Sequence, residues 1–292
     1  KAETAMAQAK QTRIFGFTFY TGDMQIHSME RLRLNKDLVE ALEQSQFTLF
    51  FQPQMDTVTR ELTGTEALVR WQPPHSKPIA PQEFIPILEE MGRIVDLGDF
   101  VLTQACAAYE RMRTSGVKLP KMAINLAGPQ LEDPNLISKI KNALTTSGMP
   151  ASCLELEVTE SILISQYERV QKRLVQLQGL GIGVALDDFG TGYSSLQYLT
   201  RYPFSKLKID KSFVWSMASS TKDFEVIRAI ISLGRSLGIK VLAEGIETQD
   251  HLQMLQDLGC DFVQGYLFSP PVDEQAFTSY LLQTRALRAL GQ

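Results

Sequence analysis

The sequence has few of the residues that hold small secreted domains or zinc sites together. Its three cysteines (Cys106, Cys153 and Cys260) lie far apart and form no CxxC motif, and its three histidines are scattered. Isolated cysteines in odd number indicate reduced thiols, and they exclude a disulfide scaffold and a zinc ribbon. A chain of 292 residues needs neither support, because it can bury about three-quarters of its unfolded surface.

Long apolar runs and an excess of one charge are also lacking. No apolar run approaches the roughly 18 residues that a membrane-spanning helix requires. The 29 basic and 33 acidic residues give a formal net charge of −4, which offers no general attraction for DNA or RNA. We therefore expect a cytoplasmic protein without a membrane segment in this chain, in which a local feature attracts any anionic ligand.

The first residues differ in pattern from the rest. Residues 2–10 are typical of the end of an amphipathic helix, 14–20 of a short strand, and 21–44 of a turn followed by a long helix. A lone helix and strand cannot form a domain. We interpret residues 1–30 as the remnant of a preceding module with its linker, and residues 31–292 as one domain. The alternative is an N-terminal decoration of the main fold.

From about residue 45 onward, short apolar runs alternate with helical periodicity. Strands are expected at 47–52, 62–71, 121–126, 153–158, 182–189, 206–210, 240–245 and 262–266. Helices are expected at 81–92, 94–115, 134–148, 161–180, 222–238, 247–258 and 273–288. Such alternation implies parallel strands covered by helices. Eight units in about 250 residues favour an α/β fold of the (β/α)8 TIM-type barrel.

Polar residues collect where the predicted strands end. They are Glu66, Asn125, Glu157, Asp187, Asp188, Lys208, Asp210, Glu244 and Gln264. In a TIM-type barrel these ends meet at one rim, where active sites lie. A buried carboxylate costs several kcal/mol unless it is paired or binds a metal. Several carboxylates with essentially one lysine among them therefore predict bound divalent cations.

The expected metal ligands are all oxygen donors. They are Glu66, Asn125, Glu157, Asp187, Asp188 and Glu244. Hard oxygen donors favour Mg²⁺ or Mn²⁺ over zinc. The adjacent pair Asp187 and Asp188 is typical of a site for two ions about 3.5–4 Å apart. Such ions would also supply the positive charge that an acidic protein needs to bind a phosphodiester.

These motifs resemble those of the EAL domain family of cyclic di-GMP phosphodiesterases, named after the Glu-Ala-Leu that stands here at 66–68. The resemblance runs from about residue 32 to 288. It rests on FQP (51–53), EALVRW (66–71), NLAGPQL (125–131), ELEVTES (155–161), DDFGTGYSSL (187–196), LKIDKSFV (207–214), AEGIET (243–248) and GCDFVQGYLFSPP (259–271). The first residues resemble the last helix and strand of a GGDEF domain. That implies a GGDEF–EAL tandem parent, which could be membrane-anchored upstream.

The resemblance implies a phosphodiesterase that hydrolyses cyclic di-GMP to linear 5′-pGpG with two Mg²⁺ or Mn²⁺ ions, and that forms a homodimer. The ligands of the first ion would be Glu66, Asn125, Glu157 and Asp187. Asp187 would bridge to the second ion, which Asp188 and Glu244 complete. The implied catalytic residues are Lys208, Glu244, Gln264 and Glu66. Among these, Lys208 and Gln264 would orient the attacking water and the scissile phosphate.

The resemblance also implies substrate contacts and supports. Gln52 and Arg70 would bind the dinucleotide, and the fork of an arginine suits a phosphate. Glu160 would anchor the loop 187–196, while Asp210 and Glu247 would support the ligands from behind.

Simpler interpretations stay open for several of these residues. Arg70 could pair with a neighbouring carboxylate, Asp210 could form an ordinary ion pair at a strand end, and Lys208 could be a mere counter-ion. Gln54 stands where the family usually has a small apolar residue. For the whole chain, the alternative function is a catalytically silent receptor that binds cyclic di-GMP.

Overall fold

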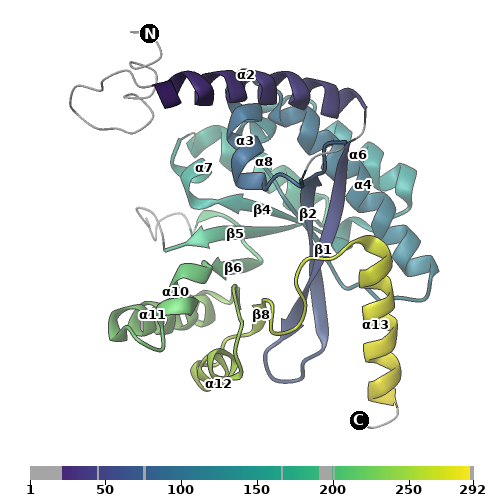
Figure 1. The fold of residues 1–292 in the computed structure, drawn as a ribbon. Coiled ribbons are helices and arrows are strands. Elements are labelled where there is room, and N and C mark those ends of the chain that lie inside the picture. The colour runs from purple at the N-terminus through teal and green to yellow at the C-terminus, as the bar shows by residue number, and fades with distance from the viewer. Residues whose placement is uncertain are drawn as a thin grey trace. The chain divides into compact units, whose positions relative to one another are not determined.

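The computed structural model describes residues 22–44, 46–74, 77–165, 167–190, 199 and 201–289. Eight strands form a closed barrel in chain order, from β1 to β8 (Figure 1). The strands are β1 (Phe47–Asp56), β2 (Leu62–Trp71), β3 (Met122–Asn125), β4 (Leu154–Thr159), β5 (Gly183–Phe189), β6 (Lys206–Ile209), β7 (Lys240–Ala243) and β8 (Phe262–Gln264). All eight predicted strands are present, and the predicted α/β barrel is confirmed.

The direction of β1 differs from the prediction of uniformly parallel strands. β1 runs antiparallel to β8, whereas the pairings from β2–β3 to β7–β8 are parallel. The cause is the short turn after β1. There the side chain of Asp56 accepts hydrogen bonds from the backbone of Val58 (3.0 Å) and Thr59 (2.8 Å), and Arg60 has a φ of 60°. A turn this short reverses the chain and joins antiparallel strands.

The helices largely follow the predicted segments. They are α2 (Gly22–Glu43), α3 (Pro81–Glu90), α4 (Ile94–Thr114), α5 (Gly128–Glu132), α6 (Leu136–Ser147), α7 (Glu160–Ser165), α8 (Tyr167–Gly179), α10 (Lys211–Ser216), α11 (Thr221–Leu237), α12 (Gln249–Leu258) and α13 (Glu274–Ala289). The short helices α5 and α10 are additions to the prediction. The helix and strand expected at 2–20 lie outside the described residues. Across the described chain, none of the helices combines the length and apolar character that crossing a membrane requires.

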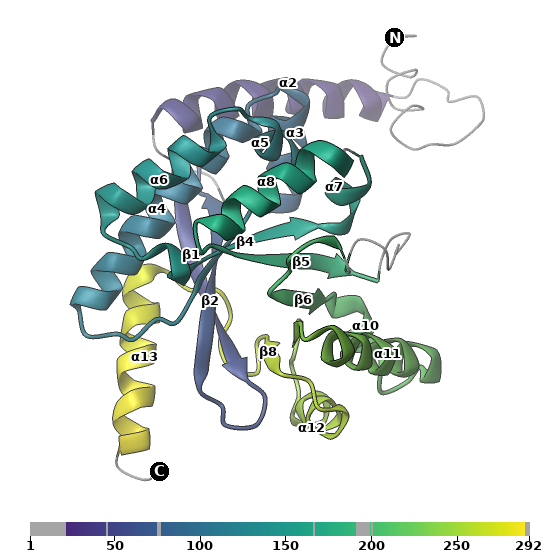
Figure 2. The same ribbon diagram turned by 180° about the vertical axis from the view of Figure 1, so that it is seen from behind.

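Helices cover the outside of the barrel strands (Figures 1 and 2). α4 packs against β3 and α6, α8 packs against β5, and α11 packs against β6 and β7. The sequence of α11 explains its limits, because Ser220 caps its first turn and Gly238 ends it in the left-handed conformation. Within α11, Gly234 permits close approach to β7, since a Cβ there would lie 2.4 Å from Val241.

The chain divides into two compact units, Lys1–Thr48 with Arg70–Arg93 and Leu49–Val69 with Ile94–Gln292. In the first unit, α2 packs against α3, and the rings of Phe47, Trp71 and Phe84 form a cluster with centroids 5.5–6.0 Å apart. The second unit holds most of the barrel strands. Helix α2 is continuous through residue 30, and the proposed division into 1–30 and 31–292 stays a prediction.

Candidate functional site

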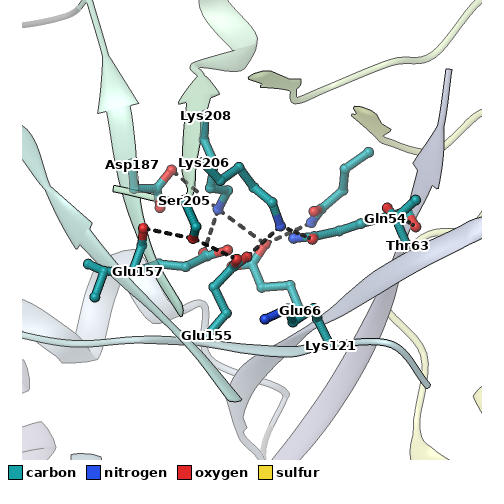
Figure 3. A network of polar contacts seen from close by, with 12 residues as sticks. Gln54, Thr63, Glu66, Lys121, Glu155, Glu157, Asp187, Ser205, Lys206 and Lys208 are labelled. Atoms are coloured by element: carbon teal, nitrogen blue, oxygen red, sulfur yellow. Dashed lines mark hydrogen bonds and ion pairs between the residues drawn. The ribbon is translucent and has the colours of Figure 1, made fainter. Parts of the chain in front are cut away.

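Lys208 is surrounded by a carboxylate cluster formed by Glu66, Glu157, Asp187 and Glu244, of which Glu244 is half-buried and the others are buried. Figure 3 shows Lys208 with Glu66, Glu157 and Asp187. Its Nζ lies 2.5 Å from Glu157, 2.8 Å from Glu244, 3.2 Å from Asp187 and 3.5 Å from Glu66, and its side chain is 1% exposed. The carboxylates come from β2, β4, β5 and the residue after β7. The barrel thus brings together five of the polar residues that the sequence places at strand ends.

Side-chain amides orient the carboxylate of Glu66. Asn125 donates a hydrogen bond to Glu66 Oε1 (2.9 Å), and Gln264 donates one to Glu66 Oε2 (2.7 Å). Gln264 also donates to Gln52 (3.0 Å), which in turn donates to the carbonyl oxygen of Ser269 (3.0 Å). Three more residues predicted for the site are therefore linked to the carboxylate cluster by hydrogen bonds.

The carboxylate cluster carries more negative charge than Lys208 can offset. Burial opposes the charge of Lys208, but Asp187, Glu157, Glu244 and Glu66 raise its pKa well above the ordinary value. Burial raises the pKa of Glu157 well above its usual range, with Glu66 adding to the effect. Burial also raises the pKa of Glu244 to about 8. Without further positive charge, some of these carboxyls stay protonated at neutral pH.

Glu66 behaves differently from its neighbours. Burial tends to raise its pKa, but Lys208 and the hydrogen bonds from Gln264 and Asn125 outweigh burial and lower the pKa overall. The charge of Lys208 is the main cause, and the hydrogen bonds add to it, because both stabilise the ionised form. Glu66 is therefore more readily kept as a carboxylate than Glu157 or Glu244.

Asp187 and Asp188 point toward one site although they are adjacent on β5. Adjacent side chains of a strand normally point to opposite faces. Here Asp188 has a φ of 54°, and the register between β5 and β6 shifts between Leu186 and Phe189. This bulge brings carboxylate oxygens of Asp187, Asp188 and Glu244 within 4.8 Å of one another. Such strain costs about 1–3 kcal/mol and is typical of functional sites.

The donor set fits a hard divalent cation. Among the described residues, two buried oxygens beside Lys208 have no hydrogen-bond partner, Glu157 Oε1 and Gln264 Oε1. An unpaired buried oxygen is costly, so a further partner for each is expected. Burial and Asp187 also raise the pKa of Asp188, and a cation would relieve this repulsion. Oxygen ligands of this kind bind hard metal ions.

Asp210 has a local role that the sequence does not reveal. It caps the N-terminus of α10, where its side chain accepts hydrogen bonds from the backbone N–H (3.0 Å) and the hydroxyl of Ser212. Helix caps of this type stabilise a helix by about 1 kcal/mol. α10 in turn carries Trp215, whose indole N–H donates to the carbonyl oxygen of Gly245 (3.0 Å).

The turn that carries Glu244 is held from two sides. On one side lies Trp215, with the Nζ of Lys211 5.3 Å from its ring centroid. On the other side, the backbone N–H of Ile246 donates to the carbonyl oxygen of Gln264 (3.1 Å). Gly245 has a φ of 73°, and a Cβ there would lie 2.5 Å from Lys211. This packing fixes the direction of the residue just before it.

Three further predicted residues lie on other parts of the described chain. Glu160 is the buried first residue of α7, and its expected partners at 190–195 lie, apart from Gly190, outside the described residues. Glu247 is exposed between β7 and α12. Arg70 lies near the end of β2, in the first unit. Their roles stay predictions.

A second buried ion pair, Glu155 with Lys206, escaped the prediction. Both side chains are buried, on β4 and β6 respectively (Figure 3). The sequence could have indicated this pair, because Glu155 is two residues before Glu157 and Lys206 is two residues before Lys208. Residues two apart on a strand face the same side. Glu155 therefore faces the barrel interior like Glu157, and Lys206 faces it like Lys208.

Comparison with known proteins finds relatives across the barrel. A family model described as EAL domain matches residues 35–271. The bifunctional diguanylate cyclase/cyclic di-GMP phosphodiesterase MucR of Pseudomonas aeruginosa is 38% identical over 271 residues, which are 93% of this chain and 40% of the relative. The cyclic di-GMP phosphodiesterase NbdA of the same species is 36% identical over 296 residues, which are 100% of this chain and 38% of the relative. The chain thus spans about 40% of the length of these relatives.

Solved structures agree with the fold. The PaMucR phosphodiesterase in complex with c-di-GMP superposes with a TM-score of 0.81 at 38% identity, covering 84% of this chain and 99% of that chain. The EAL enzyme Bd1971, with cAMP and cyclic-di-GMP bound, superposes with a TM-score of 0.82 at 32% identity, covering 87% of this chain and 70% of that chain. Both similarities extend over most of the described barrel.

Proposed function

Because this chain belongs to the EAL domain family, we propose that it hydrolyses cyclic di-GMP to linear 5′-pGpG. One observation supports the proposal: carboxylates surround the buried Lys208, and oxygens of Asp187, Asp188 and Glu244 lie within 4.8 Å of one another. The activities named for MucR and NbdA, and the c-di-GMP found with MucR, support the choice of substrate.

We propose two Mg²⁺ or Mn²⁺ ions as cofactors. The residues that would hold them are Glu66, Asn125, Glu157, Asp187, Asp188 and Glu244. Bound there, such ions would lower the pKa of a water molecule and offset the charge of the phosphodiester. Glu157 Oε1, which has no hydrogen-bond partner among the described residues, is available as a ligand atom.

Lys208 acts as a donor rather than as a base in this proposal. Without metal ions, its neighbouring carboxylates hold its pKa well above the ordinary value. A protonated amine can hold a water or a phosphate oxygen by hydrogen bonds, but it cannot accept a proton from water. Its place among four carboxylates offsets part of their mutual repulsion.

The amides and Arg70 complete the proposed site. Gln264 holds Glu66 through its NH2 group and leaves Oε1 buried without a partner among the described residues, so that oxygen can accept a hydrogen bond from a water. Gln52 is kept in place by Gln264 and Ser269 and is proposed, with Arg70, to contact the dinucleotide. Glu160 and Glu247 are proposed as supports, and Asp210 as a support through α10.

The test is turnover by the purified chain. Cyclic di-GMP is incubated with the protein in Mg²⁺ or Mn²⁺, and 5′-pGpG is measured by liquid chromatography, with Asp187→Ala as the control. Formation of 5′-pGpG by the wild type alone supports the proposal. Tight binding of cyclic di-GMP without product would instead show the silent receptor. A homodimer is also proposed, and sedimentation of the same sample measures it.

A further inference from the structure

Toward the N-terminal ends of β4 and β6, one layer away from the carboxylate cluster, the barrel interior holds a second ion pair that the proposed reaction does not use, Glu155 with Lys206 (Figure 3). The Nζ of Lys206 contacts Glu155 Oε1 and lies 2.8 Å from Gln54 Oε1. Glu155 Oε2 also accepts a hydrogen bond from the hydroxyl of Ser205 (3.3 Å). Lys206 and Glu155 are 4% and 2% exposed. We call Glu155–Lys206 the lower pair and Glu157–Lys208 the upper pair.

Both pairs join the same two strands. Glu155 and Glu157 lie on β4, and Lys206 and Lys208 lie on β6, so that each pair crosses the interior from one strand to the other. β5 lies between them in the barrel. The strands β4 and β6 are not hydrogen-bonded to each other, and the two ion pairs are direct side-chain links across β5.

β5 leaves room for the two crossings. Gly183 stands opposite Glu155 in the β4–β5 register, and Ala185 stands opposite Glu157. A Cβ on Gly183 would lie 3.3 Å from Glu155 Oε2 and 3.3 Å from the Oγ of Ser205. A larger residue would press on the lower pair. The smallest two residue types therefore occur where the lower and upper pairs pass over β5.

Gln54 contacts the lower pair through Lys206. Its side chain is fully buried and accepts a hydrogen bond from Lys206. Gly64 makes space for it, because a Cβ there would lie 2.9 Å from Gln54 Oε1. The Nζ of Lys206 also lies 5.8 Å from the ring centroid of Phe262. The lysine is thus held from β1, β4 and β8 together.

We infer that the lower pair positions the upper pair, and that Lys206 is a positioning residue for the proposed phosphodiesterase. The inference rests on the proposed function. By linking β4 to β6 one layer below, Glu155 and Lys206 set the distance between Glu157 and Lys208. The lower pair is neutral as a whole, so it provides this link without adding charge beneath the crowded carboxylates.

The lower pair therefore affects two measurable properties of the folded protein. A displacement of about 1 Å at a catalytic site can lower the rate about 10²-fold. Groups that hold metal ligands from behind contribute about 10–100-fold to metal affinity. A pair that only stabilises the fold would leave both kcat and metal affinity unchanged in protein that remains folded.

The test compares Lys206→Met with Lys240→Met. Lys240 is a matched control because it lies on the next strand and also pairs with an acid, Asp261 at 2.6 Å, but with its side chain 61% exposed. Circular dichroism confirms folding at the assay temperature. We expect Lys206→Met to lower kcat at least about tenfold, with KM within about threefold, and to weaken Mn²⁺ binding by equilibrium dialysis at least about tenfold. Lys240→Met is expected to keep the wild-type kcat, KM and Mn²⁺ affinity.

Folded Lys206→Met with wild-type kcat and wild-type Mn²⁺ affinity overturns the inference. Lys206→Met could fail to fold because it leaves Glu155 without its lysine. In that case the double variant Glu155→Gln with Lys206→Gln takes its place, and its kcat and Mn²⁺ affinity test the positioning role. Failure of both to fold makes the pair a folding requirement and overturns the positioning role. If the wild type itself gives no turnover, the proposed function fails, whereas Mn²⁺ affinity still decides on the lower pair.

Discussion

Trp215 donates its indole N–H to the carbonyl oxygen of Gly245, 3.0 Å away and one residue beyond Glu244. Half of the tryptophan side chain is exposed, so burial alone does not explain a residue of this size at the position. The hydrogen bond and the neighbouring Lys211 do explain it, because together they hold the turn that directs Glu244 toward Lys208.

Replacement of Trp215 by phenylalanine removes this hydrogen bond and keeps an aromatic ring. A single hydrogen bond contributes about 1 kcal/mol, so we expect a folded protein whose kcat falls several-fold and whose Mn²⁺ affinity falls with it. Steady-state kinetics and Mn²⁺ titration check the expectation. Val175→Ala on α8, also at an exposed apolar residue (53%), serves as the control. Equal kinetics for both variants would show that the turn needs no support from α10.

Replacement of Lys208 by alanine tests its proposed role in catalysis. We expect kcat to fall about 10²-fold or more while KM stays nearly unchanged, which is the scale of a group that orients a reacting water. The measurement is the dependence of the initial rate on cyclic di-GMP concentration. A large rise in KM at constant kcat would instead make Lys208 a residue that binds substrate.

Activity is expected to require Mg²⁺ or Mn²⁺ and to fail with Ca²⁺. Calcium binds oxygen ligands at longer distances and in larger number, and it activates water less. Glu66→Ala and Asp187→Ala should each abolish turnover, because each removes a proposed ligand. Assays after treatment with a chelator, with single metals added back, measure this. Full activity of either variant in chelated buffer contradicts a metal mechanism.

The pKa of Glu244 predicts how metal-free protein responds to pH. The carboxyl has a pKa of about 8 when folded, against 4.5 as its ordinary value. Between these values the folded state holds a proton that the unfolded state lacks, so the free energy of unfolding falls as pH rises. We expect the thermal midpoint of metal-free wild type to fall more than that of Glu244→Gln between about pH 6 and pH 8.5.

Added Mn²⁺ should offset this loss of stability at high pH. Metal and proton compete for the same carboxylates, so the ion binds more tightly as pH rises. The rise in thermal midpoint on adding Mn²⁺ is therefore larger near pH 8.5 than near pH 6. Differential scanning fluorimetry of both proteins measures the two trends. A parallel decline in wild type and Glu244→Gln would assign the pH effect to other groups.

Glu160→Ala tests the loop-anchor role. Glu160 is buried at the start of α7, and the segment at 190–195 that it is expected to hold follows closely after the proposed ligands Asp187 and Asp188. We expect the variant to fold, to keep one metal ion tightly and to lose most turnover, since a small displacement can cost about 10²-fold in rate. Wild-type kinetics, or loss of all metal binding, would contradict this role.

The strands and the residues at their ends were predictable because alternation and polarity are local signals. Glu66, Glu157, Asp187 and Lys208 meet in space since parallel strands end at one rim. The left-handed conformation of Asp188 has no comparable signal, because aspartate only tolerates it. The reversed direction of β1 was missed because its turn contains no glycine or proline.

The lower pair was missed for a different physical reason. A single charged residue within an apolar strand is easily interpreted as the end of that strand. Two charged residues at a spacing of two residues instead indicate that both side chains face the barrel interior. Only the closed barrel shows that Lys206 reaches both Glu155 and Gln54. Asp210 illustrates the same limit, because the helix that it caps was not expected.

The reversed direction of β1 separates the β1–β2 turn from the chemistry. β1 ends beside the start of β8, where Asp56 pairs with Phe262, while the carboxylate cluster lies toward the opposite ends of the parallel strands. Val58 at the tip is 74% exposed, and Thr57 behind it is held by Asp261 and Gln256. A fluorescent label attached at position 58 would thus lie on the far side of the barrel from the carboxylate cluster, which makes this hairpin an attachment point for following ligand binding without obstructing it.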